Sequence, residues 1–475
     1  MKNHILIFVL LISLCAKVAA QNMNEKITEY VQSILPERGN IVQEQRDGRF
    51  GETVWTLSNG MKVVHKKTLF VGGRIYVSAI GPGGKSLFED DDMLDANYAE
   101  DVKFIGGLGI FSWDSLHSMS LLSEEIGVET QRMFGDISKQ RIKRLFEAMY
   151  LSFTSIREDR EAFAGFKSRR CGLETYRQED KIKYPYSLRY HDPSYISEAD
   201  TARINYDRML YIYRTCFANP GSFVVSVTGD FDEDELRDCV EVYLAGLPSG
   251  NKDIKAIPRP SGLRKGKHTE KLGRYTSSND AAYAYIYSAN IKQDQSIGYQ
   301  FEIFERIIFQ QGFSLLFSTP NNDDGVSLSV SLKSNNMRDE ECLLQIILPT
   351  TFSMGMGKVK SEEAYALHEK RNARLLRELE RLKNEGPSQN EFDNAVNYLL
   401  DEFNYNHGKE SRMRYSDSRD EYWRTALENF YYYGIDVDTN YEKQIKAVTR
   451  KEIHKLMKKI LTSDNYLEII WKPEM

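Results

Sequence analysis

Histidine is the side chain most often used to bind a catalytic metal, and the chain contains eight of them. Two histidines bind one Zn²⁺ from a helix when they lie four residues apart, because both imidazoles then share one face. No two histidines of this chain have that spacing. The pair His191 and Asp192 has metal-binding chemistry, but it also fits a loop histidine that caps a helix starting near Ser197. The histidine pattern therefore predicts no helical zinc site.

Cysteines and glycine-rich turns offer two other kinds of chemistry. Four cysteines follow the first twenty residues: Cys171, Cys216, Cys239 and Cys342. They form no C-x-x-C pair, so neither a zinc ribbon nor a disulfide framework is indicated. Cys216 and Cys239 either pair after export or remain buried free thiols. The glycines at 81–84 and 106–109 lack the sequence context of a phosphate loop, so they are expected in turns and close packing.

The first twenty residues have the pattern of a signal peptide. Lys2 precedes an apolar run at 5–15, and small residues at 18–20 provide a cleavage site. This run is shorter than the roughly 20 residues of a membrane helix, and no later stretch is long and apolar enough. We expect cleavage near Ala20 and a mature protein that is exported, periplasmic or secreted, and has no membrane span.

The charge balance argues against a nucleic-acid partner. The chain has 63 Lys and Arg against 69 Asp and Glu, a net charge of −6. Its basic segments at 141–144, 371–383 and 451–459 alternate with apolar residues at helical spacing. They are therefore expected to be solvated helix faces rather than a continuous basic surface.

Apolar spacing divides the mature chain into two similar halves. After a leader at 21–50, it predicts a domain at 51–250, a linker at 251–273 rich in Pro, Gly, Lys and Ser, and a second domain at 274–475. Asn59-Gly60 indicates a hairpin between two β-rich runs, because this dipeptide accepts the positive φ angles of a type I′ turn.

The two halves repeat the same order of elements in outline. Alternating runs predict strands at 52–58, 61–67, 74–80, 222–228, 281–289, 326–333, 343–348 and 466–471. Apolar residues three and four apart predict helices at 93–104, 138–155, 157–179, 197–217, 232–247, 296–317, 361–383, 388–406, 416–433 and 450–461. An α+β fold follows, with two tandem duplicated domains, each a mostly antiparallel sheet packed with helices.

Several stretches, taken in order, resemble the pitrilysin/insulinase family of zinc peptidases. They are TLSNGMKVV at 56–64, VTGDF at 227–231 before a helix that ends in Leu-Pro at 247–248, and the helical region 379–400 with its LKNEGPS turn and Glu391. The match is closest to the second half of double-length periplasmic members, in which an active and an inactive half close around a peptide. This resemblance implies the metallopeptidase fold of the LuxS/MPP type.

Active members of that family carry an inverted H-x-x-E-H motif. Its two histidines bind Zn²⁺, its glutamate polarises the bound water, and a later glutamate completes the ligand set. In this chain the motif positions hold Asn97, Glu100 and Asp101, so both histidines are absent and only the glutamate is retained. The resemblance therefore implies that the chain has lost its own metal site. We expect no cofactor in this chain and zinc in a partner half.

Active relatives also hold substrate through an Arg and a Tyr, seven residues apart, in the second domain of the non-catalytic half. Arg306 and Phe313 occupy those positions here. Loss of the tyrosine hydroxyl removes a hydrogen-bond donor that is worth ~2.7–4 kcal/mol in an oxyanion role. The pair is a candidate substrate-binding site; the alternative is a core Phe313 and a surface charge at Arg306.

Three functions are compatible with these residues. The preferred one is a non-catalytic subunit that forms a heterodimer with a zinc-bearing family member and supplies part of a peptide-binding chamber. The second is an active zinc peptidase with ligands drawn from Glu100, Asp101 and either Glu174 or Glu179. The third is a peptide-binding scaffold that works alone.

Overall fold

The computed structural model describes residues 23–119, 122–170, 202–249, 257, 265–272, 281–291, 295–317, 325–326, 329–334, 341–351, 361–409 and 419–471. The chain folds into two compact units. The first unit takes the described residues of 1–171, 198–258 and 413–439, and the second takes those of 259–412 and 440–475. None of the helices in these described ranges is long and apolar enough to cross a membrane.

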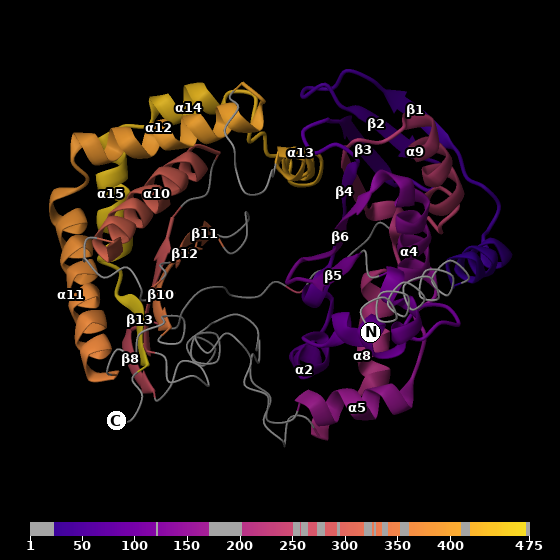
Figure 1. Cartoon of the computed structure of the whole chain (residues 1–475), viewed down its shortest axis with the longest axis horizontal. Helices are drawn as coiled ribbons and strands as arrows, with labels where there is room; N and C mark the ends of the chain where they lie inside the picture. The colour runs from indigo at the N-terminus through magenta and orange to yellow at the C-terminus, as the bar shows by residue number, and fades with distance from the viewer. Residues whose placement is uncertain are drawn as a thin grey trace, which may run out of the picture. The chain divides into compact units, whose positions relative to one another are not determined.

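The first unit is built on a seven-stranded sheet (Figure 1). Its strands are β1 (Ile41–Gln45), β2 (Thr53–Leu57), β3 (Lys62–Lys67), β4 (Arg74–Pro82), β5 (Ser123–Ile126), β6 (Thr130–Ser138) and β7 (Val224–Gly229). The spatial order is β1-β2-β3-β7-β4-β6-β5. Only β3 and β7 run parallel; the other neighbours in this sheet are antiparallel.

The hairpin predicted at Asn59-Gly60 joins β2 to β3. Gly60 has a φ of 94°, but Asn59 does not have a positive φ, so the turn is not type I′. Asn59 instead uses its side chain: Oδ1 accepts from the Met61 N–H at 3.1 Å, and Nδ2 donates to the Leu244 carbonyl at 2.8 Å. The turn is therefore held by an amide side chain that also ties the hairpin to the helical layer.

Helices cover one face of this sheet. They include a helix at 23–34, α4 (Ile142–Thr154), α5 (Arg160–Arg170), α8 (Tyr206–Cys216) and α9 (Glu233–Cys239). The helix at 23–34 lies in the segment that the sequence suggests is a leader, and its Ile27 and Val31 are fully buried. Cys216 and Cys239 are buried free thiols, and burial raises the pKa of each to about 12. This answers the disulfide question that the sequence leaves open.

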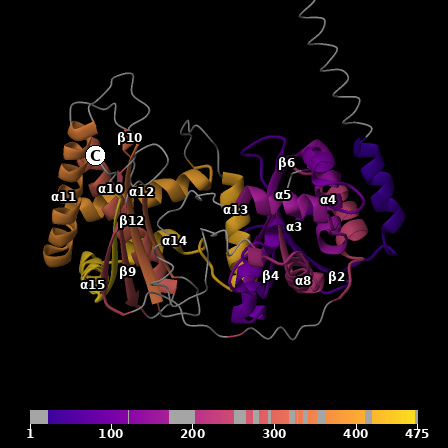
Figure 2. The ribbon, with the colours of Figure 1, turned by 90° about the horizontal axis from the view of Figure 1, so that it is seen from below.

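A helix from late in the chain covers the opposite face of the same sheet. Helix α13 (Arg419–Glu428), continued by a π-helical turn at Asn429–Tyr433, lies on the side of β4 away from α4 (Figures 1 and 2). Its buried apolar residues pack with others from the sheet and its loops: Phe50, Val54, Val64, Ile80, Val224, Trp423, Ala426 and Leu427. The sequence places residues 419–439 in the second domain, whereas the structure packs them in the first unit, because this apolar face needs cover.

Polar contacts fix the position of α13 on the sheet. Ser78 Oγ donates to Glu428 Oε2 at 2.5 Å, and Thr228 Oγ1 donates to the Asp420 carbonyl at 2.6 Å. The Lys66 ammonium lies 4.6 Å from the centroid of the Trp423 ring. Because buried polar groups need partners, these contacts set the register of the helix along β4 and β7.

The second unit contains a six-stranded sheet. Its strands are β8 (Lys267–Leu272), β9 (Ala281–Asn290), β10 (Gly325–Val326), β11 (Ser329–Ser334), β12 (Glu341–Thr351) and β13 (Asn465–Trp471). The order is β10-β12-β9-β13-β8, with β11 also paired to β12. Only β13 and β8 are parallel.

Helices α10 (Gln295–Phe317), α11 (Ser361–Glu385) and α15 (Arg450–Leu461) lie against one face of this sheet, with α12 (Gln389–Asn406) and α14 (Tyr441–Ala447) packed on α10 (Figure 2). The α+β class predicted from the sequence is confirmed. The sequence missed β1, β5, β6, β8 and α14.

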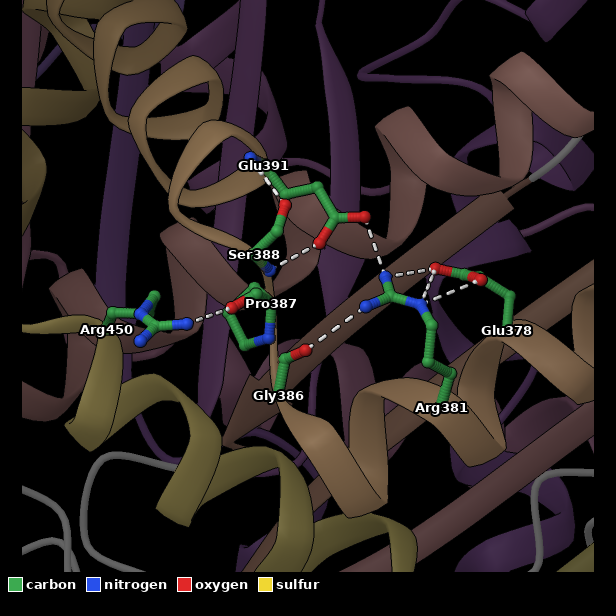
Figure 3. A network of polar contacts seen from close by, with 7 residues as sticks. All are labelled: Glu378, Arg381, Gly386, Pro387, Ser388, Glu391 and Arg450. Atoms are coloured by element: carbon green, nitrogen blue, oxygen red, sulfur yellow. Dashed lines mark hydrogen bonds and ion pairs between the residues drawn. The ribbon is translucent and has the colours of Figure 1, made fainter.

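The turn between α11 and α12 is held by the polar network of Figure 3. Arg381 contacts Glu378 on its own helix and Glu391 on α12, and it also donates to the Gly386 carbonyl at 3.3 Å. Ser388 and Glu391 form a capping box that starts α12. Gly386 has a φ of 76°, and a Cβ there would lie 2.7 Å from the His454 ring. The NEGPS segment thus specifies a sharp, closely packed corner.

We predict that Trp423→Ala lowers the free energy of unfolding of the first unit by roughly 3–5 kcal/mol, because it leaves a cavity in the cluster under α13. Urea denaturation followed by circular dichroism measures this. Glu421→Ala is the matched control, since that side chain is 58% exposed on the same helix. A loss below about 1 kcal/mol for Trp423→Ala would show that α13 is not part of the core.

Candidate functional site

The segment aligned with the zinc motif is not one continuous helix, contrary to the prediction for 93–104. It consists of α2 (Met93–Ala96), a 3₁₀ turn at Ala99–Asp101 and α3 (Val102–Gly106). Tyr98 lies between them with φ −116° and ψ 1°. It is buried, with its ring 6.3 Å from that of Phe166. The spacing of apolar residues in the sequence does not reveal a single non-helical residue. The buried residues before and after Tyr98 still recur at helical intervals.

This interruption changes the geometry at the two positions where the family has histidines. Around Tyr98 the main-chain bonds run between residues three apart: Tyr98 N–H to the Asp95 carbonyl and Asp101 N–H to the Tyr98 carbonyl. Asn97 ends α2, and Asp101 lies at the end of the next turn. The two side chains therefore do not share the continuous helical face that a pair of zinc ligands requires.

Glu100, the retained motif residue, has a structural partner. Its Oε2 accepts from the main-chain N–H of Ile126 in β5 at 3.0 Å. Burial raises the pKa of Glu100, and the Ile126 hydrogen bond opposes that shift. Across the described residues, no group of three or more His, Cys, Asp and Glu side chains could hold a metal ion. The candidate ligands Glu174 and Glu179 and the pair His191 and Asp192 lie outside the described residues.

A buried ion pair lies three residues further along, and sequence reasoning missed it. Lys103 Nζ lies 3.0 Å from Glu124 Oε1, and these side chains are only 3% and 0% exposed. Lys103 also donates to the Leu122 carbonyl at 2.7 Å. A lysine at an apolar position of a predicted helix is the one sequence feature that could have indicated such a pair. The sequence does not show which carboxylate pairs with it; the structure does.

Arg306 lies in a pocket of about 450 Å³ in the second unit. The pocket is lined by Glu302, Glu305, Arg306, Phe309, Val330, Tyr398, Leu399 and Glu402, from α10, α12 and β11. The guanidinium of Arg306 lies over the ring of Tyr398, and burial lowers its pKa. Its Nε is buried and has no hydrogen-bond acceptor among the described residues. Phe313 lies further along α10, and its side chain is outside the described set.

Two histidines are core residues rather than metal ligands. The His65 ring packs against that of Trp55, with centroids 4.1 Å apart and planes tilted by 54°, and it also contacts Phe231. His368, on α11, lies beside Tyr283 of β9. Burial lowers the pKa of each to about 4. Both imidazoles are therefore neutral at pH 7 and serve packing.

Comparison with known proteins shows what part of this chain is similar to. Residues 203–399 match the description "Peptidase M16 inactive domain". A curated relative, the zinc protease PQQL-like of Arabidopsis thaliana, is 23% identical over 253 residues, which cover 51% of this chain and 25% of that protein. The predicted resemblance to the pitrilysin/insulinase peptidases is thus confirmed, and the family match lies at residues 203–399.

Solved structures agree on the fold. The periplasmic protease PqqL of Escherichia coli has a TM-score of 0.63 and 13% identity, over 93% of this chain and 47% of PqqL. A protease from Helicobacter pylori has a TM-score of 0.63 and 14% identity, over 92% of this chain and 100% of that one. The M16 inactive domain from Pseudomonas fluorescens has a TM-score of 0.62 and 15% identity, over 89% and 98%. This chain spans about half of PqqL and a quarter of the Arabidopsis relative.

We predict that acid destabilises the protein partly through His65. Its folded pKa of about 4 lies below the ordinary value of 6.5, so the unfolded chain binds this proton first as the pH falls. The stabilisation is complete above pH 6.5 and is lost towards pH 4, up to about 2.5 kcal/mol at pH 4.5.

Urea denaturation of wild type and His65→Phe at pH 7.5 and pH 4.5 measures this effect. The variant is expected to lose less stability between the two pH values than wild type does. His268→Gln, at a half-buried position of β8, should leave the wild-type pH dependence unchanged. Equal pH dependence in His65→Phe and wild type would contradict the prediction.

Proposed function

We propose that this chain is the non-catalytic half of an exported M16-type zinc peptidase and forms part of a peptide-binding chamber with a zinc-bearing partner. The observation that carries the proposal is the state of the motif segment. Asn97 and Asp101 stand where zinc ligands are needed, the helix between them is interrupted at Tyr98, and Glu100 is bonded to a main-chain N–H. Asparagine is a poor zinc ligand, and one carboxylate does not replace two imidazoles.

Chemistry and the match to one half of a longer protease support the proposal of a partner. Peptide hydrolysis in this family requires an activated water on zinc, and in the proposed assembly a zinc-bearing half supplies it. The chain matches about half of PqqL, which is a periplasmic protease of Escherichia coli. A heterodimer with a zinc-bearing family member would supply the missing half. In such an assembly the metal belongs to the partner.

The pocket around Arg306 supports a contact with peptide. The Arg306 side chain lines this pocket, where a guanidinium N–H can donate a hydrogen bond to a peptide carbonyl oxygen. Phe309, Val330 and Leu399 supply the apolar wall. Phe313 cannot donate a hydrogen bond, so the role proposed for this pair is holding substrate rather than stabilising an oxyanion.

We predict that the purified chain contains no stoichiometric zinc and hydrolyses no peptide, because it lacks both histidine ligands. Metal analysis by mass spectrometry and a quenched-peptide assay measure these. Co-expression with an H-x-x-E-H family member from the same organism is expected to give a 1:1 complex in size-exclusion chromatography with light scattering.

Other outcomes would assign other functions. Stoichiometric zinc that disappears in Glu100→Gln or Asp101→Ala would contradict the proposal and support an active peptidase with atypical ligands. A chain that stays monomeric beside every zinc-bearing candidate, yet binds peptide saturably without hydrolysis, would support a stand-alone scaffold.

We predict that Arg306→Ala weakens peptide binding by the heterodimer roughly tenfold, through loss of a charge-assisted hydrogen bond. Fluorescence anisotropy with a labelled substrate peptide measures the dissociation constant. Arg377→Ala, an exposed arginine on α11, is the control and should bind as wild type does. An unchanged dissociation constant in Arg306→Ala would exclude this pocket from the chamber.

A further inference from the structure

Strand β5 ends the sheet of the first unit and pairs only with β6 in that sheet. An edge strand carries main-chain N–H and C=O groups that a further strand can bond. In an antiparallel pair, alternate residues direct these groups towards the neighbour and away from it. The Ile126 N–H is bonded away from β6, so the main-chain groups of Leu122 and Glu124 also belong to the outer edge.

Side chains of the motif segment occupy both ends of this outer edge. The Ile126 N–H donates to Glu100 Oε2 at 3.0 Å, and the Leu122 carbonyl accepts from Lys103 Nζ at 2.7 Å. Lys103 is in turn held by its buried ion pair with Glu124, whose side chain lies between the two capped positions. Two bonds from one helical segment therefore span the four-residue strand.

We infer that Glu100 and Lys103 cap the outer edge of β5 and close it to the addition of a peptide strand. An incoming strand bonds the main-chain N–H and C=O groups of every second residue along the edge. Between the two capped groups, only the main-chain groups of Glu124 remain for such a strand. The retained glutamate is thus a strand-edge cap in this chain, and peptide contacts in the proposed chamber lie elsewhere. The inference needs neither the partner nor the metal.

Hydrogen–deuterium exchange on the full chain tests the cap at Ile126. In Glu100→Ala the amide of Ile126 is expected to exchange at least roughly tenfold faster than in wild type. In Glu100→Gln it should stay protected, because the amide oxygen of Gln still accepts. Both substitutions remove the acid–base chemistry of the carboxyl group, but only Glu100→Ala removes the hydrogen-bond acceptor. Comparing them therefore separates a capping role from an acid–base role.

The core amides provide the internal control. Exchange at Val77, in the centre of β4, should be the same in all variants, which shows that the sheet remains folded. An Ile126 amide that exchanges equally in Glu100→Ala and wild type, with Val77 unchanged, overturns the inference. If both amides exchange faster in Glu100→Ala, the variant has lost structure, and Glu100→Gln decides the question. An Ile126 amide that is unprotected in Glu100→Gln, while Val77 stays protected, also overturns the inference.

A strand-addition assay tests closure directly. The probe is a fluorescein-labelled peptide with the sequence of β6, Thr130–Ser138, which is the natural antiparallel partner of β5. The variant combines Glu100→Ala with Lys103→Met and Glu124→Leu, so that no buried charge is left unpaired. The variant is expected to bind the probe at least roughly tenfold more tightly than wild type. Equal binding by the two proteins, or none by either, overturns closure.

Discussion

The packing of α13 on the sheet of the first unit is the constraint on which that unit depends. A sheet with two apolar faces must bury both, and the chain covers the second face with a helix that begins only at Arg419. The aromatic cluster at Phe50 and Trp423 supplies the apolar contact. Ser78 with Glu428 and Thr228 with Asp420 then fix the helix in one register. The first unit is therefore built from segments that are not continuous in sequence. The linker predicted from composition does not by itself mark the boundary of this unit.

Protein groups anchor the segment of Asn97, Glu100 and Asp101 to the sheet. The buried pair of Lys103 with Glu124, 3.0 Å apart, ties it to β5. Burying a charge is costly unless it has partners, and here the ammonium also donates to the Leu122 carbonyl. Glu100 bonds the same strand through the main-chain N–H of Ile126. Two residues of this segment therefore hold it against β5.

Much of the fold could be predicted from local signals. The Asn59-Gly60 hairpin and the long helices α11 and α12 follow from turn chemistry, helical spacing and the capping box at Ser388. Strands β5 and β6 could not, because the buried Glu124 and Gln131 take apolar positions of the alternation. Their partners, Lys103 for Glu124 and the main chain of Pro82 and Gly84 for Gln131, are distant in sequence. The loss of both histidines was visible in the sequence. The break at Tyr98 was not, since it depends on tertiary contacts rather than on spacing.

The late position of α13 also shapes how the chain is made. Strand β7 ends at Gly229, so some 190 residues separate it from the helix that covers it. During synthesis the first sheet has one apolar face uncovered until most of the chain has emerged. Contacts this distant in sequence close slowly, because a long loop must be ordered before they contribute. The protein therefore has a long interval in which a chaperone or a neighbouring chain competes with α13 for the same surface.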